Sequence, residues 1–299
     1  MQPTAAHSLC IACLLVDGAA RAWRLRVLVG ALGGTVGFLD ALWANLVEDA
    51  AAALTPMRLA GLPARAVVLR RAGVGTGITL LASVAESALM YPVVLATGTA
   101  LALAFAPDWW RGVAPQVART SVDAGRWLAL ALALGVVAWI AVRRHLPRVH
   151  RSARLTLADA WREMRRAGAA ALGVNVALTL ASIAARLAIL PILTRTVVPS
   201  PALGAVTFSS FVLLYGQLLL PMPSGAGAVE IGFLAGGAGV AGTAASRLLL
   251  PWRLYTALIA VGAGLLVVVA STAYSLSRRQ SAARPHPLTR WPSDEEGNP

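Results

Sequence analysis

Residues 73–105 read GVGTGITLLASVAESALMYPVVLATGTALALAF, a run of 33 residues with a single charge, Glu86. A helix of that length would extend about 50 Å, whereas the hydrocarbon core of a bilayer is about 30 Å thick. The run is therefore more than long enough to cross a membrane. We expect either one tilted helix kinked near Pro92 or a helix followed by a re-entrant segment.

The composition of the whole chain agrees with this run. Of the 299 residues, 58% are hydrophobic and 13% are charged, and the mean hydropathy is +0.69. A soluble domain is roughly half apolar and about a quarter charged, so this chain has too little polar surface to cover itself in water. The composition predicts an all-α, polytopic integral membrane protein.

The net charge of +13 comes from 26 arginines and no lysine. A basic protein can bind nucleic acid, but these arginines cluster between apolar runs, as cationic residues do in cytoplasmic loops of membrane proteins. Residues 143–166 hold eight arginines and two acids. We therefore expect no nucleic-acid partner, and we expect a bacterial plasma (inner) membrane protein whose basic loop 143–166 is cytoplasmic. Apolar spacings in that loop are partly consistent with a helix on the membrane surface.

Further apolar runs suggest about six to eight membrane segments. Pro107–Arg126 is expected to be a loop that starts with interfacial tryptophans, and Thr194–Ala202 is expected to be an outside loop. From Ser277 the composition becomes polar, which predicts a disordered cytoplasmic tail over 277–299. The other apolar runs are 27–47 (continuing to 54), 127–142, 167–193, 203–220, 221–242 and 252–274.

The N-terminus has a short apolar run, Leu9–Val16, which follows an extension of residues 1–8. Eight residues cannot cross a bilayer. A signal-peptide core, a truncated span and a misassigned start remain open. The basic patch Arg21, Arg24 and Arg26 follows this run.

The segment Pro221-Met222-Pro223-Ser224-Gly225-Ala226-Gly227-Ala228-Val229-Glu230 predicts a broken helix. Proline lacks a backbone N–H and clashes with the preceding turn, and glycine permits unusual backbone conformations. Broken backbone at membrane depth needs protein or a water-filled cavity around it, and transporters use such segments as binding sites. The alternative is a loop outside the bilayer followed by an ordinary span from about Ala228.

No soluble-enzyme motif is present, and the four histidines fall in predicted loops or termini. Cys10 and Cys13 form a lone CIAC, which is too few ligands for a four-ligand zinc site. We expect no enzyme activity, no catalytic residue, no metal and no cofactor.

The broken-helix segment resembles the P-x-P-G-G-x-G-x-x-E signature of the lysylphosphatidylglycerol synthase transmembrane (flippase-like) family. Ser224 stands where that family usually has the first glycine of its pair. The matching residues are Pro221, Pro223, Gly225, Gly227 and Glu230.

Weaker similarities occur in the order that the family has. They are Ala22–Arg24, the stretch from Asn45 through Pro56 and Arg58 to Gly61 and Arg65, Ala82–Glu86, and Arg253–Thr256 with Gly262 and Gly264. The resemblance covers residues 9–276, and we expect no aminoacyl-transferase domain and no lysyl-transfer activity. It implies a bundle of helices, some broken or re-entrant, around a central cavity that moves a lipid or lipid-linked headgroup between leaflets.

Three positions depart from the family pattern. Leu62 replaces an acid, and Ser87 and Met90 stand where arginine and aspartate are usual. There is also one extra residue between Pro56 and Arg65. Should those charges serve transport, this member differs in substrate, coupling or activity.

Charges at membrane depth are costly, at about 2.5–3.5 kcal/mol each on insertion scales, so they must pair or face water. We expect Glu230 to pair with Arg186 or Arg253. Arg58 and Arg65 are expected to receive a lipid phosphate, which the planar arginine fork suits. The expected transport path comprises Glu230, Arg186, Arg253, Arg58, Arg65 and Glu86.

The leading hypothesis is a flippase-like protein whose partner is a membrane lipid, either an anionic or an aminoacylated phospholipid. One alternative is a membrane scaffold or regulatory subunit without transport activity. Another is a membrane-embedded transferase acting on polyprenyl-linked substrates. The residues leave the oligomeric state open.

Overall fold

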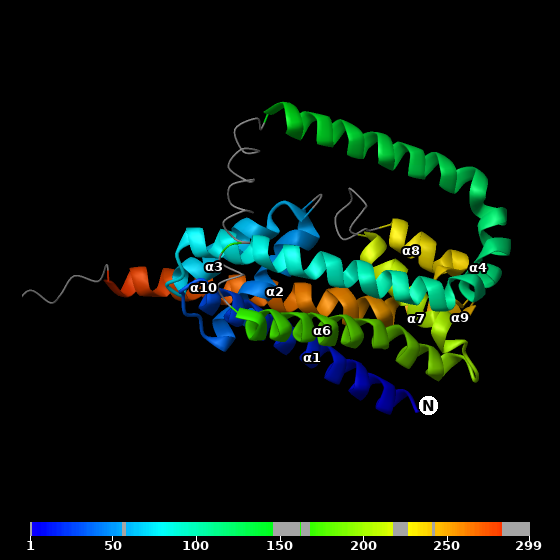
Figure 1. The fold of residues 1–299 in the computed structure, drawn as a ribbon, viewed down its shortest axis with the longest axis horizontal. Coiled ribbons are helices and arrows are strands. Elements are labelled where there is room, and N and C mark those ends of the chain that lie inside the picture. Colours follow the sequence, from blue (N-terminus) through cyan, green and yellow to red (C-terminus); the bar gives the residue numbers. More distant parts are fainter. Residues whose placement is uncertain are drawn as a thin grey trace, which may run out of the picture.

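The computed structural model describes residues 2–55, 58–145, 162, 168–217, 227–240 and 243–282, with side chains placed outside 112–145 and 274–282. All regular elements among these residues are helices (Figure 1). The all-α prediction is confirmed. In chain order the elements are α1 (Pro3–Ala31), α2 (Phe38–Leu54), α3 (Gly61–Arg71), α4 (Thr76–His145), α6 (Gly168–Val197), α7 (Leu203–Gly216), α8 (Ala228–Gly232), η4 (Phe233–Gly237), α9 (Thr243–Arg253), η5 (Leu254–Leu258) and α10 (Ile259–Ala282).

Four helical stretches of the described residues are long and apolar enough to cross a membrane. Their outer faces carry many exposed leucines and valines, such as Leu95, Leu103, Leu266 and Val269. Such faces suit lipid rather than water. The protein is therefore a multi-pass membrane protein. The four stretches are Pro3–Ala31, Thr76–Arg111, Gly168–Val197 and Thr243–Ala273.

The N-terminal helix corrects two expectations. Leu9–Val16 is the middle of α1 rather than a short separate span, and the basic patch at Arg21–Arg26 continues the same helix. A run of charges normally ends a membrane span. Here Asp17 and Arg24 are buried against other helices, so α1 continues through them.

Residues 27–55 do not form one continuous helix. α1 ends at Ala31, the chain turns through Gly33 at a positive φ of 78°, and α2 begins at Phe38. α2 then packs on α1, α3 and α10. The turn lets Asp49 of α2 face Arg21 of α1, while Glu48 pairs with Arg65 of α3.

α4 is helical through Pro92, as one of the two readings of 73–105 expected. It also continues through Pro107–Arg126, so the loop predicted there is wrong. The polar residues at this point satisfy each other at helical spacing, because Arg111 Nη2 binds Asp108 Oδ1 at 2.5 Å one turn away. In Figure 1 the helix turns at one end of the molecule and then runs back.

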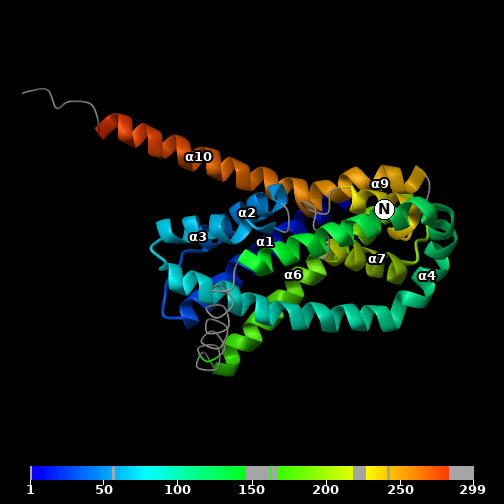
Figure 2. The ribbon, with the colours of Figure 1, turned by 90° about the horizontal axis from the view of Figure 1, so that it is seen from above.

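The second half of the chain contains two π-helical segments, η4 and η5. α6 is long and apolar enough to cross, as predicted for 167–193, but it continues to Val197. The loop expected at Thr194–Ala202 is therefore limited to residues 198–202, which connect α6 to α7, and α9, η5 and α10 follow one another without an interruption. Residues 277–282, expected in the tail, are the last turns of α10, which extends beyond the other helices (Figure 2). Residues 283–299 and nearly all of the predicted surface helix in 143–166 lie outside the described residues.

Two buried apolar clusters hold the bundle together, and α1 contributes to both. One contains Leu25 and Leu28 with residues of α2, α3 and α4. The other contains Cys10 with residues of α6, α7, η4 and α9, including Phe233 and Trp252. The segment of α1 between Cys10 and Leu25 carries Asp17, Arg21 and Arg24, and these three side chains belong to the candidate site.

Candidate functional site: an ionic cavity between the two cores

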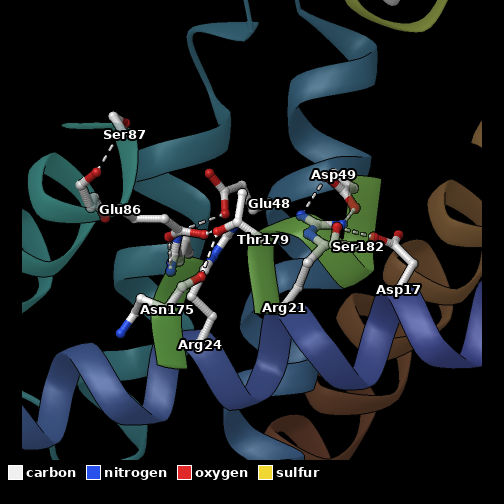
Figure 3. A network of polar contacts seen from close by, with 12 residues as sticks. Asp17, Arg21, Arg24, Glu48, Asp49, Glu86, Ser87, Asn175, Thr179 and Ser182 are labelled. Atoms are coloured by element: carbon white, nitrogen blue, oxygen red, sulfur yellow. Dashed lines mark hydrogen bonds and ion pairs between the residues drawn. The ribbon is translucent and has the colours of Figure 1, made fainter. Parts of the chain in front are cut away.

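One face of α1 carries the first three charges of the site. Asp17, Arg21 and Arg24 are separated by four and then three residues, so they lie on the same side of a helix. Figure 3 shows all three pointing from α1 toward carboxylate and hydroxyl groups on other helices. The charges of α1 therefore face protein rather than lipid.

Asp49 of α2 contacts two arginines, and one of them lies closer than the other. The guanidinium of Arg21 donates to both carboxylate oxygens of Asp49, with Nη2 at 3.0 Å from Oδ1. Arg58 Nη2 lies at 3.5 Å from the same Oδ1. Two-pronged arginine–carboxylate contacts are among the strong ones, so Arg21 is the principal partner of Asp49.

Arg65 of α3 lies between two carboxylates. Its Nη1 is 3.0 Å from Glu48 Oε2, and its Nη2 is 2.6 Å from Glu86 Oε2. Glu86 also pairs with Arg24 of α1, whose other terminal nitrogen donates to Thr179 Oγ1 at 3.2 Å. Glu86 thus joins α1, α3 and α4 through two guanidinium groups.

Asp17 connects α1 to α6. Arg186 Nε donates to Asp17 Oδ2 at 2.8 Å, and Ser182 Oγ donates to Oδ1 at 2.5 Å. Ser182 and Arg186 are one helical turn apart, so α6 presents both donors on one side. Each oxygen of the buried carboxylate therefore has a partner.

Apart from Asp17, these groups line a cavity of about 580 Å³. Volumes of this size are usual for small-molecule sites. The lining combines charged side chains with large, mainly apolar ones, namely Leu62, Met90, Tyr91 and Leu214. Its described charged residues are five arginines and three carboxylates: Arg21, Arg24, Arg58, Arg65, Arg186, Glu48, Asp49 and Glu86.

The structure divides the predicted site residues into two groups. Arg58, Arg65, Glu86 and Arg186 line the cavity together. Glu230 and Arg253 do not line it. They form a separate ion pair, with Arg253 Nη2 at 2.5 Å from Glu230 Oε1. The prediction that Glu230 pairs with Arg186 or Arg253 is confirmed for Arg253, whereas Arg186 pairs with Asp17.

Sequence reasoning missed five charged residues of the network: Asp17, Arg21, Arg24, Glu48 and Asp49. In the sequence, Arg21 and Arg24 are recognisable only as part of a basic patch after a short apolar run. The spacing of Asp17, Arg21 and Arg24 on one face of a helix was the signal that could have placed them together. The pair Glu48–Asp49 offered a weaker signal, since it interrupts an otherwise apolar stretch.

The Glu230–Arg253 pair lies where the predicted broken helix restarts. Glu230 Oε2 accepts a hydrogen bond of 2.7 Å from the N–H of Gly227, which adopts a positive φ of 84°. One carboxylate therefore binds the first turn of α8 and the end of α9 at once. Pro221, Pro223 and Gly225 lie outside the described residues, so the break itself stays a prediction.

Aromatic packing supports this second region. Phe233 of η4 lies against Trp252 of α9, with ring centroids 5.1 Å apart, and both are fully buried. The guanidinium of Arg253 lies 5.4 Å from the centre of the Trp252 ring. The ion pair is thus anchored to the apolar core on one side.

Comparison with known proteins places the fold and both charged regions in one family. No curated protein and no solved structure gives a significant match. A family model described as the lysylphosphatidylglycerol synthase TM region matches residues 4–264, which include every residue of the ionic cavity and the Glu230–Arg253 pair. The chain therefore belongs to the lysylphosphatidylglycerol synthase TM region family.

Proposed function

We propose that the protein moves a phosphate-bearing membrane lipid between leaflets, unchanged, with the lipid headgroup in the ionic cavity. The observation that carries the proposal is the cavity itself, with its surplus of arginines inside a bundle of membrane helices. Ionisable residues within membrane segments are costly and usually mark a substrate or ion path. Family membership relates the chain to lipid chemistry only in general terms.

The arginines differ in how free they are to bind a phosphate. Arg65 is 3% exposed and already contacts two carboxylates. Arg186 and Arg58 are more accessible, with side chains 29% and 45% exposed. We therefore assign the first contact with a phosphate to Arg58 and Arg186, with Arg65 holding the carboxylates in place. The planar guanidinium fork matches the oxygens of a phosphate.

The apolar part of the lining suits the rest of a lipid. Leu62 and Tyr91 are 37% and 58% exposed and lie beside the charged side chains in the cavity wall. A lipid could place its phosphate among the arginines while its acyl chains lie past these residues in the surrounding bilayer.

Glu230 and Arg253 receive a different role. We propose that they hold the helix that restarts at Gly227 against α9, outside the headgroup path. This role follows from their contacts, since Glu230 bridges Gly227 N–H and Arg253.

The test is transbilayer movement of fluorescent phosphatidylglycerol in liposomes that contain the purified protein. The intact protein should make the inner-leaflet probe accessible to an impermeant quencher. Arg186→Gln should slow this by about tenfold, which corresponds to ~1.4 kcal/mol of activation free energy. Arg70→Gln, on the exposed end of α3, is the matched control and should leave the rate unchanged.

A folded protein that moves no labelled phospholipid in liposomes contradicts the proposal and leaves the scaffold hypothesis. Release of a chemically altered lipid would favour the transferase hypothesis instead.

A further inference from the structure

We infer that the cavity selects headgroups of net negative charge through Arg58 and disfavours headgroups that carry an added ammonium group. This inference rests on the proposed function and specifies its substrate class.

Among the described residues, the ion pairs of the ionic cavity leave one arginine without a carboxylate of its own. Four arginines each have a close partner: Arg21 with Asp49, Arg24 with Glu86, Arg65 with Glu48, and Arg186 with Asp17. The fifth, Arg58, shares Asp49 with Arg21. Five guanidinium groups against four carboxylates leave one positive charge, and the geometry assigns it to Arg58.

Arg58 is also the least tightly held of the five. Its contact with Asp49 is 3.5 Å, and its side chain is 45% exposed, compared with 3% for Arg65 and 6% for Arg24. An exposed ion pair of this length contributes little by itself. The guanidinium can therefore exchange Asp49 for a phosphate oxygen without leaving a buried carboxylate bare, because Arg21 still holds Asp49.

The backbone places Arg58 at this position at some conformational cost. Arg58 has a positive φ of 59°, the left-handed region that residues other than glycine seldom adopt. Its N–H donates to the carbonyl of Thr55, and Thr55 Oγ1 accepts from the N–H of Ala60. Strained residues of this kind concentrate at functional sites. The turn between α2 and α3 thus presents one guanidinium to the cavity.

The same pairing predicts what the cavity rejects. An ammonium group on the headgroup would need a carboxylate, and the three described carboxylates of the lining are already bound to arginines. It would also lie among five guanidinium groups. Juxtaposed like charges are a common source of discrimination between partners. A single phosphate diester meets neither obstacle.

The experiment compares three labelled lipids in identical liposomes: phosphatidylglycerol, phosphatidylethanolamine and lysyl-phosphatidylglycerol. Their net charges are negative, zero and positive. We expect phosphatidylglycerol to move at least about tenfold faster than lysyl-phosphatidylglycerol, with phosphatidylethanolamine between them. The preference should shrink at high salt, because screening weakens exposed charge interactions.

Arg58→Gln should remove most of this preference by slowing phosphatidylglycerol selectively, whereas Arg58→Lys should keep it in part. Arg70→Gln is the control. Equal or faster movement of the lysyl lipid by the intact protein overturns the inference but leaves the proposed function standing, as does an Arg58→Gln effect of equal size on all three lipids. Failure of the intact protein to move any of the three overturns the proposed function, and this inference with it.

Discussion

The ionic cavity and the Glu230–Arg253 region are both charged, but they are built in opposite ways. The network around the cavity has charges from α1, α2, α3, α4 and α6 and from the α2–α3 turn, over residues 17–186. Figure 3 shows those of α1, α2 and α4. The second region uses one pair, 23 positions apart in sequence, beside a recognisable motif. The more conspicuous sequence pattern therefore accompanies the simpler charge arrangement.

Burial differs between the two regions as much as connectivity does. Glu86 and its two arginines are at most 10% exposed, whereas Glu230 is 33% exposed. Removing one member of a buried charge group leaves the others bare in a low-dielectric environment, which costs far more than breaking an accessible pair. Measuring the free energy of unfolding of variants in both regions tests this difference.

The largest expected effect is that of Glu86→Ala. This change leaves the guanidinium groups of Arg24 and Arg65 without their shared carboxylate. We expect a loss of about 3–5 kcal/mol in the free energy of unfolding, the range for breaking a buried pair. Equilibrium unfolding in detergent micelles, followed by tryptophan fluorescence, measures it.

Asp108→Ala serves as the control, since its pair with Arg111 is 60–77% exposed and should contribute little. A Glu86→Ala protein as stable as the unaltered one would mean that the cavity is wet enough to solvate both guanidinium groups.

A second prediction concerns the packing of α10 on α2, the helix that carries Glu48 and Asp49. Gly264 of α10 packs directly on α2, and a Cβ there would lie 2.1 Å from the carbonyl oxygen of Leu46. Gly264→Ala must push α10 away from the helix that carries Glu48 and Asp49. We expect a loss of about 1–3 kcal/mol, the usual cost of overpacking, together with slower lipid movement.

Gly262→Ala is the matched control, because a Cβ there meets no atom within 4 Å. Alanine favours helix over glycine, so this variant should be neutral or slightly stabilising. Equal behaviour of the two variants would show that α10 adjusts freely against α2.

The membrane class and the crossing segments could be predicted because hydrophobicity is a local property of the sequence. Runs such as 73–105 and 167–193 are long and apolar enough to be recognised as candidate membrane spans. The N-terminal helix could not, because Asp17 and Arg24 count as breaks in hydropathy but are neutralised by partners on α4 and α6. Ion pairing between residues 60 to 170 positions apart is tertiary information that no local pattern contains.

The same reasoning explains why the site was predicted only in part. Glu86 and Arg186 were found because each is a charge inside an apolar run, whereas Arg58 and Arg65 were found because they stand in a segment that resembles the family pattern. Glu230 was placed with them because motif and charge coincide there, yet it contacts Gly227 and Arg253 instead. Membrane burial of a charge identifies a candidate, but only its partners decide to which site it belongs.

The smallest expected effect, that of Glu230→Gln, tests this distinction directly. The amide oxygen of glutamine can still accept the hydrogen bond from Gly227 N–H, but the amide NH2 then faces Arg253, so the negative charge and the acceptor for Arg253 are both lost. For a carboxylate that is one-third exposed we expect a loss of about 1 kcal/mol or less. Lipid movement by the folded protein should stay within about twofold of normal.

Glu230→Ala, which also removes the acceptor for Gly227, should cost roughly 1 kcal/mol more. Loss of lipid movement in Glu230→Gln at unchanged stability would instead place this carboxylate on the headgroup path. The ionic cavity would then be one of two charged stations along that path rather than the whole of the site.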